Sequence, residues 1–589
     1  MNTTTDYNLN IETADSNRKA MRKMLQFMKG EKRNLWAAFL VMLLNAGITM
    51  LTPYLIGYAI DHYIQTGQLR GLMLFSGFVL ACYIVWAGTE YLQTQLMGSV
   101  GQRMLYALRN EVFHKLQQLP VAFFNQNKSG DLISRINNDT DKVNQFFSQS
   151  LMRFADSIFM MTGAAVFLLS IHTELGAASL IPAVFILAFV LLASPWVKKK
   201  NATGLKATGG LSAEVQESLH NFKTIIAFNR RDYFRKRFDE ANRHNYRASV
   251  IAGLANGIFT PVFTFFSNIA QLIVLAFGIY LIAQGHFTIG LLISFIAYVQ
   301  NFYQPLRQLA ELWAGYQTAM AAWDRISVIL SLESNMQQLP EPTVSEGISQ
   351  DSVIRFENVS FQYPGGAKVL HHINFDLKRG KTYALVGPTG GGKTTTASLI
   401  ARLYDPTEGK VLLHNRDIRS YPEAERSREI GFILQDPFLF TGSLRENILY
   451  GNEAIGNISS EALEDMMRTA GLGSLLMRFE KGLDTELLSS AEGMSLGQKQ
   501  LIAFIRAILR KPKILILDEA TANIDTVTEQ LLEEILQQLP SETTRVIIAH
   551  RLNTIENADE IFFVNSGAVI PAGNLDHALA MLLSDKRAS

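Results

Sequence analysis

A chain of 589 residues is too long for one hydrophobic core, so two or more domains are expected. Hydrophobic residues make up 48% of the chain and charged residues only 18%, which is unusual for a soluble protein and indicates a strongly apolar region. The 54 Lys and Arg side chains nearly balance the 53 Asp and Glu side chains, so nothing in the net charge of +1 favours nucleic acid as a partner. The single cysteine, Cys82, excludes a disulfide framework and a cysteine-based metal site.

The N-terminal segment, residues 1–34, is polar and rich in Lys and Arg. It lacks the short apolar core and the small-residue cleavage site of a signal peptide. We therefore expect this segment to lie in the cytosol.

Uncharged apolar runs follow, each long enough to cross the hydrocarbon core of a bilayer as a helix. The runs that predict the first four spans are Leu35–Ile60, Leu72–Thr89, Ser157–His172 and Leu175–Val197. A fifth run, Ala248–Leu306, contains no Asp, Glu, Lys or Arg and is long enough for two spans, with a turn at Ala283–His286. The sequence thus predicts an α-helical transmembrane domain of six spans, residues 35–326, embedded in the lipid bilayer.

The orientation of the spans follows from the Lys and Arg residues. The segments between spans two and three and between spans four and five are long and basic, so they belong in the cytosol. The other connections are short and leave little protein outside the membrane. We expect a multi-pass protein of the cell membrane, inner or plasma, whose spans continue as helices into the cytosol.

A polar stretch with two prolines marks a linker, residues 327–352, and a soluble domain follows at residues 353–589. In that domain, short apolar runs alternate with helical patterns, as expected of a parallel sheet covered by helices. The runs are Tyr383–Val386, Ile514–Leu517 and Arg545–Ile548. This pattern predicts an α/β domain that also lies in the cytosol.

The residues 387–394 read Gly-Pro-Thr-Gly-Gly-Gly-Lys-Thr and complete the pattern GxxxxGK[ST] directly after the first of these runs. Glycines let backbone N–H groups surround phosphates, Lys393 adds a positive charge, and the Thr394 hydroxyl can reach Mg²⁺. Such a pattern can also arise by chance in a long chain. Together with the preceding strand, it predicts a site for a nucleoside triphosphate.

Two adjacent carboxylates, Asp518 and Glu519, end the apolar run Ile514–Leu517. A buried strand that delivers two acids to its end is poorly explained by solubility. Asp518 can hold magnesium through water, and Glu519 can act as the general base for an attacking water molecule.

In their order and spacing, these residues resemble the ATP-binding cassette (ABC) transporters, and specifically exporter-type half-transporters with the membrane domain ahead of the nucleotide-binding domain. The resemblance covers nearly the whole chain. It rests on Tyr363 as the adenine-stacking aromatic residue, Gly387–Thr394 as Walker A, Gln435 as the Q-loop, Met494–Gln498 as the signature, Asp518–Glu519 as Walker B, Ala522–Asp525 as the D-loop and His550 as the switch histidine.

The resemblance implies roles for individual residues, with ATP and Mg²⁺ as cofactors. The implied catalytic residues are Glu519, His550 and Gln435. The implied magnesium ligands are Thr394, Gln435 and Asp518. The implied ATP contacts are Tyr363, Gly387, Pro388, Thr389, Gly390, Gly391, Gly392, Lys393, Thr394, Thr395, Ser495, Gly497, Gln498 and Asp525. Taken alone, the Ser-x-Gly-Gln pattern at 495–498 can also merely cap a helix.

Two intracellular segments resemble the family's coupling loops, which transmit ATP-driven movements to the membrane domain. They are Gly130–Arg135 with the following Asp139, and Glu214–Phe228. Considered singly, either could also be a solvated amphipathic helix.

The sequence departs from the family pattern near the signature. Leu496 replaces a glycine, Asn523 and Ile524 replace the usual Ala-Leu, and Ser489-Ser490 stands where many relatives carry a glutamate. These changes cluster on the face that the resemblance offers to a second subunit's ATP. They favour a heterodimer with another half-transporter over a homodimer. A homodimer is the alternative, because Ser495, Gly497 and Gln498 of the signature are retained.

The last two predicted spans carry polar but uncharged side chains, at Asn268, Gln271, Gln300, Asn301 and Gln304. Phenylalanines accompany them, although Phe in membrane helices more often packs or faces lipid. Because a fixed charge at mid-membrane is costly and none occurs here, the expected cargo is a lipophilic or amphipathic drug, lipid or apolar peptide. The alternatives are a lipid flippase for envelope construction and an ATP-gated channel or regulatory subunit that does not pump.

Overall fold

The computed structural model describes residues 7–9, 23–24, 26–27, 29–336, 338–340, 351–452, 455–470, 472–473, 479, 481–487, 494–518, 526–537, 539–548, 555–573 and 575–584. The chain divides into two compact units. We call Glu12–Lys115 together with Leu132–Leu330 the helical unit. We call Met1–Ile11, Leu116–Asp131 and Ser331–Ser589 the sheet unit.

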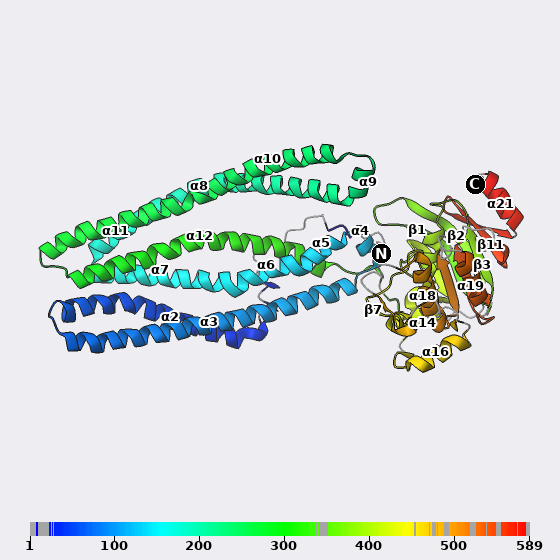
Figure 1. Ribbon diagram of the computed structural model, residues 1–589, viewed down its shortest axis with the longest axis horizontal. Helices are drawn as coiled ribbons and strands as arrows, with labels where there is room; N and C mark the ends of the chain where they lie inside the picture. Colours follow the sequence, from blue (N-terminus) through cyan, green and yellow to red (C-terminus); the bar gives the residue numbers. More distant parts are fainter. Residues whose placement is uncertain are drawn as a thin grey trace. The chain divides into compact units, whose positions relative to one another are not determined.

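Long helices build the helical unit (Figure 1). They are α2 (Lys32–Ala59), α3 (Leu69–Gln117), α7 (Leu151–Ile171), α8 (Thr173–His220), α10 (Arg231–Gly257), α11 (Phe259–Ala283) and α12 (Ile289–Ser331). Short helical elements lie between them: η1 (Lys29–Glu31), the π-helical turns η2 (Ile60–Ile64), η3 (Arg135–Asp139) and η4 (Phe146–Ser150), and the helices α5 (Ser129–Ser134), α6 (Thr140–Gln145) and α9 (Phe222–Ala227).

Five helical stretches of the described chain are long and apolar enough to cross a membrane. They are Lys32–Ile64, Leu69–Gln117, Ser129–Ile171, Thr173–His220 and Arg231–Ala283. They contain the first five predicted spans. The sixth falls within α12, which is long enough but carries the polar residues Gln300, Asn301 and Gln304, and these lower its hydropathy. The predicted turn at Ala283–His286 separates α11 from α12, with Gly285 at φ +76°.

Helices α2 and α12 approach each other closely at two glycines. A Cβ atom on Gly290 would lie 2.1 Å from the carbonyl oxygen of Gly57. Next to this crossing, the Ser294 hydroxyl donates to the carbonyl of Pro53 at 2.7 Å, and the Tyr298 hydroxyl donates to that of Met50 at 2.7 Å. Small residues that allow close backbone approach, with hydrogen bonds between helices, are typical of packing inside membranes.

Helices α8 and α10 run side by side and are joined at one end by the short helix α9 (Figure 1). Polar contacts connect them along their length. Arg237 of α10 pairs with Glu214 at 2.8 Å and with Glu217 at 3.2 Å, and the amides of Asn201 and Asn256 bond to each other. The pair therefore forms a continuous two-helix arm, for which α9 makes the tip.

Two sheets and a short β-ribbon make up the sheet unit (Figure 1). An antiparallel sheet has the order β2-β1-β4-β5, formed by β1 (Ser352–Gln362), β2 (Lys368–Lys378), β4 (Glu408–Leu413) and β5 (Arg416–Asp417). The larger sheet has the order β12-β11-β3-β10-β9-β6 and consists of β3 (Thr382–Val386), β6 (Ile430–Ile433), β9 (Ile514–Asp518), β10 (Thr544–Ile548), β11 (Glu560–Asn565) and β12 (Ala568–Gly573). Strands β7 (Gly442–Ser443) and β8 (Glu486–Leu487) form the ribbon.

All strands of the larger sheet are parallel except β12, which confirms the predicted α/β domain and its three predicted strands. Alternate residues of each strand enter two different cores, as the two-residue repeat of a strand requires. On β9, Ile514 and Ile516 pack with the antiparallel sheet and α13, whereas Leu515 and Leu517 pack on the other face with the remaining helices. Both faces of the sheet are thus covered.

The sheet unit also contains several helices. They are α4 (Val121–Gln126), α13 (Lys393–Ile400), α14 (Glu423–Glu429), α15 (Leu444–Leu449), α16 (Ser460–Thr469), α18 (Leu496–Leu509), α19 (Thr526–Gln537) and α21 (Leu575–Ser584), with 3-10 turns η5 (Ile418–Ser420) and η7 (Gly482–Asp484). The α4 helix comes from between α3 and α5 in the chain but belongs to this unit. The last membrane helix ends at Ser331, and β1 begins at Ser352.

The Gly57–Gly290 crossing leads to a test of the helical unit. Gly290→Ala should lower the apparent Tm of the purified protein, because overpacking of this kind costs about 1–3 kcal/mol. Gly77→Ala is the matched control, since no atom lies within 4 Å of a Cβ placed on Gly77 of α3. That control should leave Tm unchanged or raise it, because Ala favours a helix interior over Gly by roughly 0.5–1 kcal/mol. Equal Tm values for the two variants would show that the crossing is loosely packed.

Candidate functional site

The glycine loop follows the buried strand β3 and lies against β11. A Cβ atom on Gly387 would lie 2.0 Å from the Val564 carbonyl oxygen, and one on Gly391 would lie 2.5 Å from the same atom. Gly387, Gly390 and Gly392 have φ angles of +143°, +81° and +114°. These values disfavour residues with a side chain. The loop therefore presents bare backbone, as a cradle for phosphates requires.

Helix α13 begins at Lys393, directly after the loop. The Lys393 side chain is only 5% exposed, and its Nζ donates to the carbonyls of Gly387 at 2.9 Å and Pro388 at 3.0 Å. Its positive charge is therefore held against the loop by the loop's own backbone. Thr394 and Thr395 follow in the first turn of α13, where the helix N-terminus favours anions.

The proposed magnesium ligands Thr394 and Asp518 lie together. The Thr394 hydroxyl is 3.3 Å from Oδ1 of Asp518, which ends β9 and is 5% exposed. A hydroxyl and a buried carboxylate are hard oxygen donors of the kind Mg²⁺ takes when it completes its shell with phosphate and water. This donor set fits the ion. Gln435 follows β6 at the same edge of the sheet; its side chain is exposed, and its carbonyl accepts from Nε2 of Gln500 at 3.4 Å.

The predicted adenine-stacking residue Tyr363 is connected to α13. Its hydroxyl lies 3.0 Å from Oγ1 of Thr395, and its ring contacts Phe361 and Tyr404 edge-on, at centroid distances of 4.8 and 5.2 Å. The Tyr404 hydroxyl accepts a hydrogen bond of 2.7 Å from Nδ2 of Asn125 in α4. Burial raises the pKa of Tyr404, so its hydroxyl stays protonated at neutral pH.

The signature segment starts α18 with a capping box. The Ser495 hydroxyl accepts from the backbone N–H of Gln498 at 3.2 Å, and Oε1 of Gln498 accepts from the N–H of Ser495 at 2.9 Å. Gly497 is buried in the first turn, while Leu496 is half-buried. The helix-capping role that this pattern also predicts is therefore present, and a helix N-terminus lies at the signature.

Three predicted site residues, Glu519, Asp525 and His550, lie outside the described residues, as do the D-loop 522–525 and Ser489-Ser490. In the chain, Glu519 directly follows β9, and His550 comes shortly after β10. These two strands are paired, with Ile548 opposite Asp518. The roles of the three residues remain predictions.

The first predicted coupling segment, Gly130–Arg135 with Asp139, comes shortly after the short helix α4 in the chain. A contact with Tyr404 of the nucleotide-binding domain is made by α4, through Asn125. Arg135 and Asp139 are buried in the helical unit, where Asp139 pairs with Lys142 at 3.2 Å and Arg325 at 3.0 Å. At the second segment, the short helix α9 lies within the expected range Glu214–Phe228.

The polar side chains expected to line a cavity divide by exposure. Asn268, Gln300 and Gln304 are exposed in the single chain, and Gln271 and Asn301 are half-buried. The accompanying phenylalanines divide as well: Phe263 and Phe295 belong to the core of the helical unit, whereas Phe265 is 60% exposed. Packing therefore explains part of this aromatic set.

Sequence reasoning missed a polar cluster between α2 and α3. Nδ2 of Asn45, a residue only 7% exposed, lies 3.1 Å from the Thr89 hydroxyl and 3.3 Å from Oε2 of Glu90. Glu90 comes directly after the uncharged run that predicts the second span, so the sequence pattern marks it only as the end of that run. A lone Asn within an apolar helix was the available signal. Gln500 and Tyr404 were also missed, because neither belongs to a short pattern.

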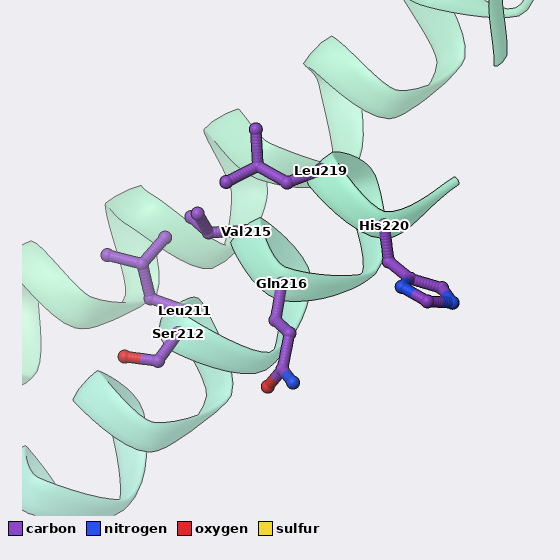
Figure 2. Close-up of a pocket in the computed structure, with 6 residues that line it drawn as sticks. All are labelled: Leu211, Ser212, Val215, Gln216, Leu219 and His220. Carbon is purple, nitrogen blue, oxygen red and sulfur yellow. The ribbon is translucent and has the colours of Figure 1, made fainter. Parts of the chain in front are cut away.

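An open hollow lies along the end of α8, next to α9 (Figure 2). Leu211, Val215 and Leu219 form an apolar row at four-residue spacing, and Ser212, Gln216 and His220 form a polar row beside it. On α9 and directly after it, Phe222 is 54% exposed and Phe228 is 74% exposed. The tip of the arm therefore exposes apolar side chains.

Comparison with known proteins gives matches over most of the chain. The family model of the ABC transporter transmembrane region matches residues 35–306, and that of the ABC transporter matches residues 370–522. The chain is 33% identical over 572 residues to the uncharacterized ABC transporter ATP-binding protein YfiC of Bacillus subtilis, covering 96% of this chain and 93% of the relative. It is 31% identical over 501 residues to the fatty acid ABC transporter ATP-binding/permease protein of Mycobacterium bovis, covering 85% and 78%.

The fold is similar to a solved structure of a bacterial Atm1-family ABC exporter with ATP bound. The TM-score is 0.77, the identity is 24%, and the match covers 94% of this chain and 96% of that one. This likeness concerns the fold alone. Taken with the two family models and the relatives, it leads to one conclusion: the chain belongs to the ATP-binding cassette transporters, as an ATP-hydrolysing multi-pass membrane protein of the exporter type.

Proposed function

We propose that this chain is a half-transporter that works as a dimer and uses ATP to export lipophilic or amphipathic compounds. Their source is the cytosol or the inner leaflet of the cell membrane. The observation that carries the proposal is the pairing of Thr394 with Asp518 beside a bare glycine loop, in one chain with long apolar helices. This combination supplies both an ATP-hydrolysing site and a path across a bilayer.

ATP hydrolysis requires that the phosphates of ATP are held in place and that the attacking water molecule is oriented. In the proposed site, Lys393 and the loop N–H groups bind the phosphates, and Tyr363 stacks on adenine. Thr394, Asp518 and Gln435 would hold Mg²⁺, which neutralises the developing charge on the phosphates. Glu519 would take a proton from the attacking water, while His550 and Gln435 flank the γ-phosphate.

A second subunit completes the site in this proposal. The α18 N-terminus at Ser495 and Gly497 would face the ATP held by the partner, because a helix N-terminus favours a phosphate. ATP binding would then draw the two nucleotide-binding domains together, and hydrolysis would release them. Alternating access of the membrane cavity follows from this cycle.

The arm formed by α8, α9 and α10 supports the dimer. Its tip exposes the apolar side chains of Phe222, Ile226 and Phe228. The nucleotide-binding domain has an apolar surface of its own near Gln435, formed by Leu434, Phe438, Phe440 and Tyr450, which are 45%, 61%, 39% and 54% exposed. Exposed apolar patches of this kind mark sites of protein contact. We propose that α9 of one subunit docks on this surface of the other.

The orientation in the membrane is part of the proposal. The N-terminal segment and the nucleotide-binding domain would lie in the cytosol, because segments rich in Lys and Arg are expected on the cytosolic side of a membrane. For the cargo, the exposed uncharged amides on α11 and α12 and the fatty acid transporter among the relatives favour an amphiphile.

A lipid flippase and a non-pumping channel are the rival functions. Inside-out vesicles that contain the protein separate them. ATP-dependent uptake of a fluorescent long-chain fatty acid supports the exporter, movement of labelled phospholipid between leaflets supports the flippase, and ion current through a held-open pore supports the channel.

The role of Lys393 can be tested by binding alone. Lys393→Ala should weaken ATP binding roughly 10- to 100-fold, because a hydrogen bond from a charged group contributes about 1.5–3 kcal/mol. Lys410→Ala is the matched control, since Lys410 pairs with Glu357 on the surface at 3.1 Å. Titration with a fluorescent ATP analogue measures both. Unchanged affinity for Lys393→Ala would remove the lysine from the phosphate site.

The general-base role of Glu519 predicts a separation of binding from turnover. Glu519→Gln should keep its affinity for ATP and lose about 10²- to 10⁴-fold in hydrolysis rate, the usual contribution of general-base catalysis. Glu534→Gln, at an exposed position of α19, is the control and should keep the wild-type rate. Full hydrolysis by Glu519→Gln would assign the base elsewhere.

The heterodimer is tested by purifying the chain alone in lipid nanodiscs. A heterodimeric subunit should hydrolyse ATP at less than roughly a tenth of the rate that it reaches with its partner, because its altered signature face cannot serve a second copy of its own site. Particle mass and hydrolysis rate are measured together. A stable two-copy particle with Glu519-dependent hydrolysis would establish the homodimer instead.

A further inference from the structure

Residues 7–9 lie against the short helix α4, which is far away in the sequence. Tyr7 is 1% exposed, and its ring meets Phe123 of α4 edge-on at a centroid distance of 6.3 Å and an interplanar angle of 89°. Phe123 itself is fully buried.

Three hydrogen bonds join this segment to α4 and its C-cap, Asn127. The Tyr7 N–H donates to Oε1 of Gln126 at 2.8 Å. Nδ2 of Asn127 donates to the Tyr7 carbonyl at 2.9 Å, and the Leu9 N–H donates to Oδ1 of Asn127 at 3.2 Å. The Asn127 side chain thus hydrogen-bonds to both the Tyr7 carbonyl and the Leu9 N–H, as the backbone of a neighbouring strand would.

The tyrosine hydroxyl reaches the linker that follows α12. It donates to the Glu333 carbonyl at 3.2 Å and accepts from the Asn335 N–H at 2.9 Å. Burial raises the pKa of Tyr7, so the hydroxyl remains a donor at neutral pH. The Tyr7 side chain therefore contacts both α4, through its ring, and the linker, through its hydroxyl.

On its other side, α4 reaches the adenine-binding residue. Asn125 donates to the Tyr404 hydroxyl at 2.7 Å, and Tyr404 packs edge-on against Tyr363 at 5.2 Å. Tyr363 in turn contacts Thr395 of α13 at 3.0 Å. A continuous set of contacts therefore leads from Tyr7 through α4 to the nucleotide site.

Helix α4 has only six residues, Val121–Gln126, and a helix this short is not stable by itself. Its place depends on the contacts around it. We propose that residues 7–9 form a strap that fixes α4, so that Tyr7 is a positioning residue for ATP binding, acting through Asn125 and Tyr404. This inference rests on the proposed function of Tyr363 in holding adenine.

Amide hydrogen exchange of the full-length protein in nanodiscs tests the strap directly. Tyr7→Phe keeps the ring against Phe123 but removes the acceptor of the Asn335 N–H, so exchange at Asn335 should rise about fivefold while α4 stays protected. Tyr7→Ala also removes the ring, and exchange across Val121–Gln126 should then rise at least tenfold. Tyr106→Phe is the control, since Tyr106 is 70% exposed on α3. The short helix α9 serves as the internal reference in all variants.

ATP hydrolysis measured against ATP concentration tests the functional part. Tyr7→Ala and Asn125→Ala should each raise KM for ATP about threefold and change kcat by less than twofold. The double variant should raise KM no further than either single variant, because both changes act through the same helix. If residues 7–9 had no role in positioning α4, Tyr7→Ala would leave KM unchanged, or the KM increases of the two single variants would multiply in the double variant.

Two results would overturn the strap. One is wild-type exchange of α4 and Asn335 in Tyr7→Ala. The other is faster exchange with an unchanged KM, which would reduce Tyr7 to an anchor. Failure of the proposed function would give a different result. In that case the wild-type protein, measured with its partner present, would show no ATP hydrolysis that depends on Glu519. This outcome would contradict the ATPase assignment, whatever the exchange data show.

Discussion

The contact between the glycine loop and β11 is the constraint on which the nucleotide site depends. Gly387 and Gly391 both approach the carbonyl of Val564 too closely for any side chain. The loop must therefore run as bare backbone over the end of its neighbour strand. Because β11, β3, β10, β9 and β6 are parallel, their carboxyl ends meet at one edge of the sheet. That edge brings Thr394 within hydrogen-bonding distance of Asp518, although the two residues are 124 positions apart in the chain.

Much of this arrangement could be predicted from the sequence, because it depends on local rules. The apolar run before Gly387 predicts a buried strand, and the glycines predict the loop. The run before Asp518 predicts a second strand of the same sheet. The helix start at Ser495 also follows a local rule, since a serine with glutamine three residues later forms a capping box.

Other parts could not be predicted, because they depend on pairs that are far apart in the chain. Asn125 and Tyr404 are 279 positions apart, and Tyr7 and Asn335 are 328 apart. Neither side chain of either pair stands in a pattern that marks it. The same limit applies near the first coupling segment. Gly130–Arg135 matched the family in sequence, whereas the contact with Tyr404 is made by α4, whose apolar residues gave no separate signal.

The signature shows how one segment can be constrained in the fold and open to change at its surface. Ser495 and Gln498 satisfy each other's backbone N–H groups, and this fixes the start of α18 whatever side chain stands at position 496. Gly497 is buried in the same turn. The half-buried Leu496 therefore departs from the family pattern without cost to the capping box. In the proposed dimer this end of the helix faces the partner's ATP, so there the departure would bear on the partner rather than on the capping of α18.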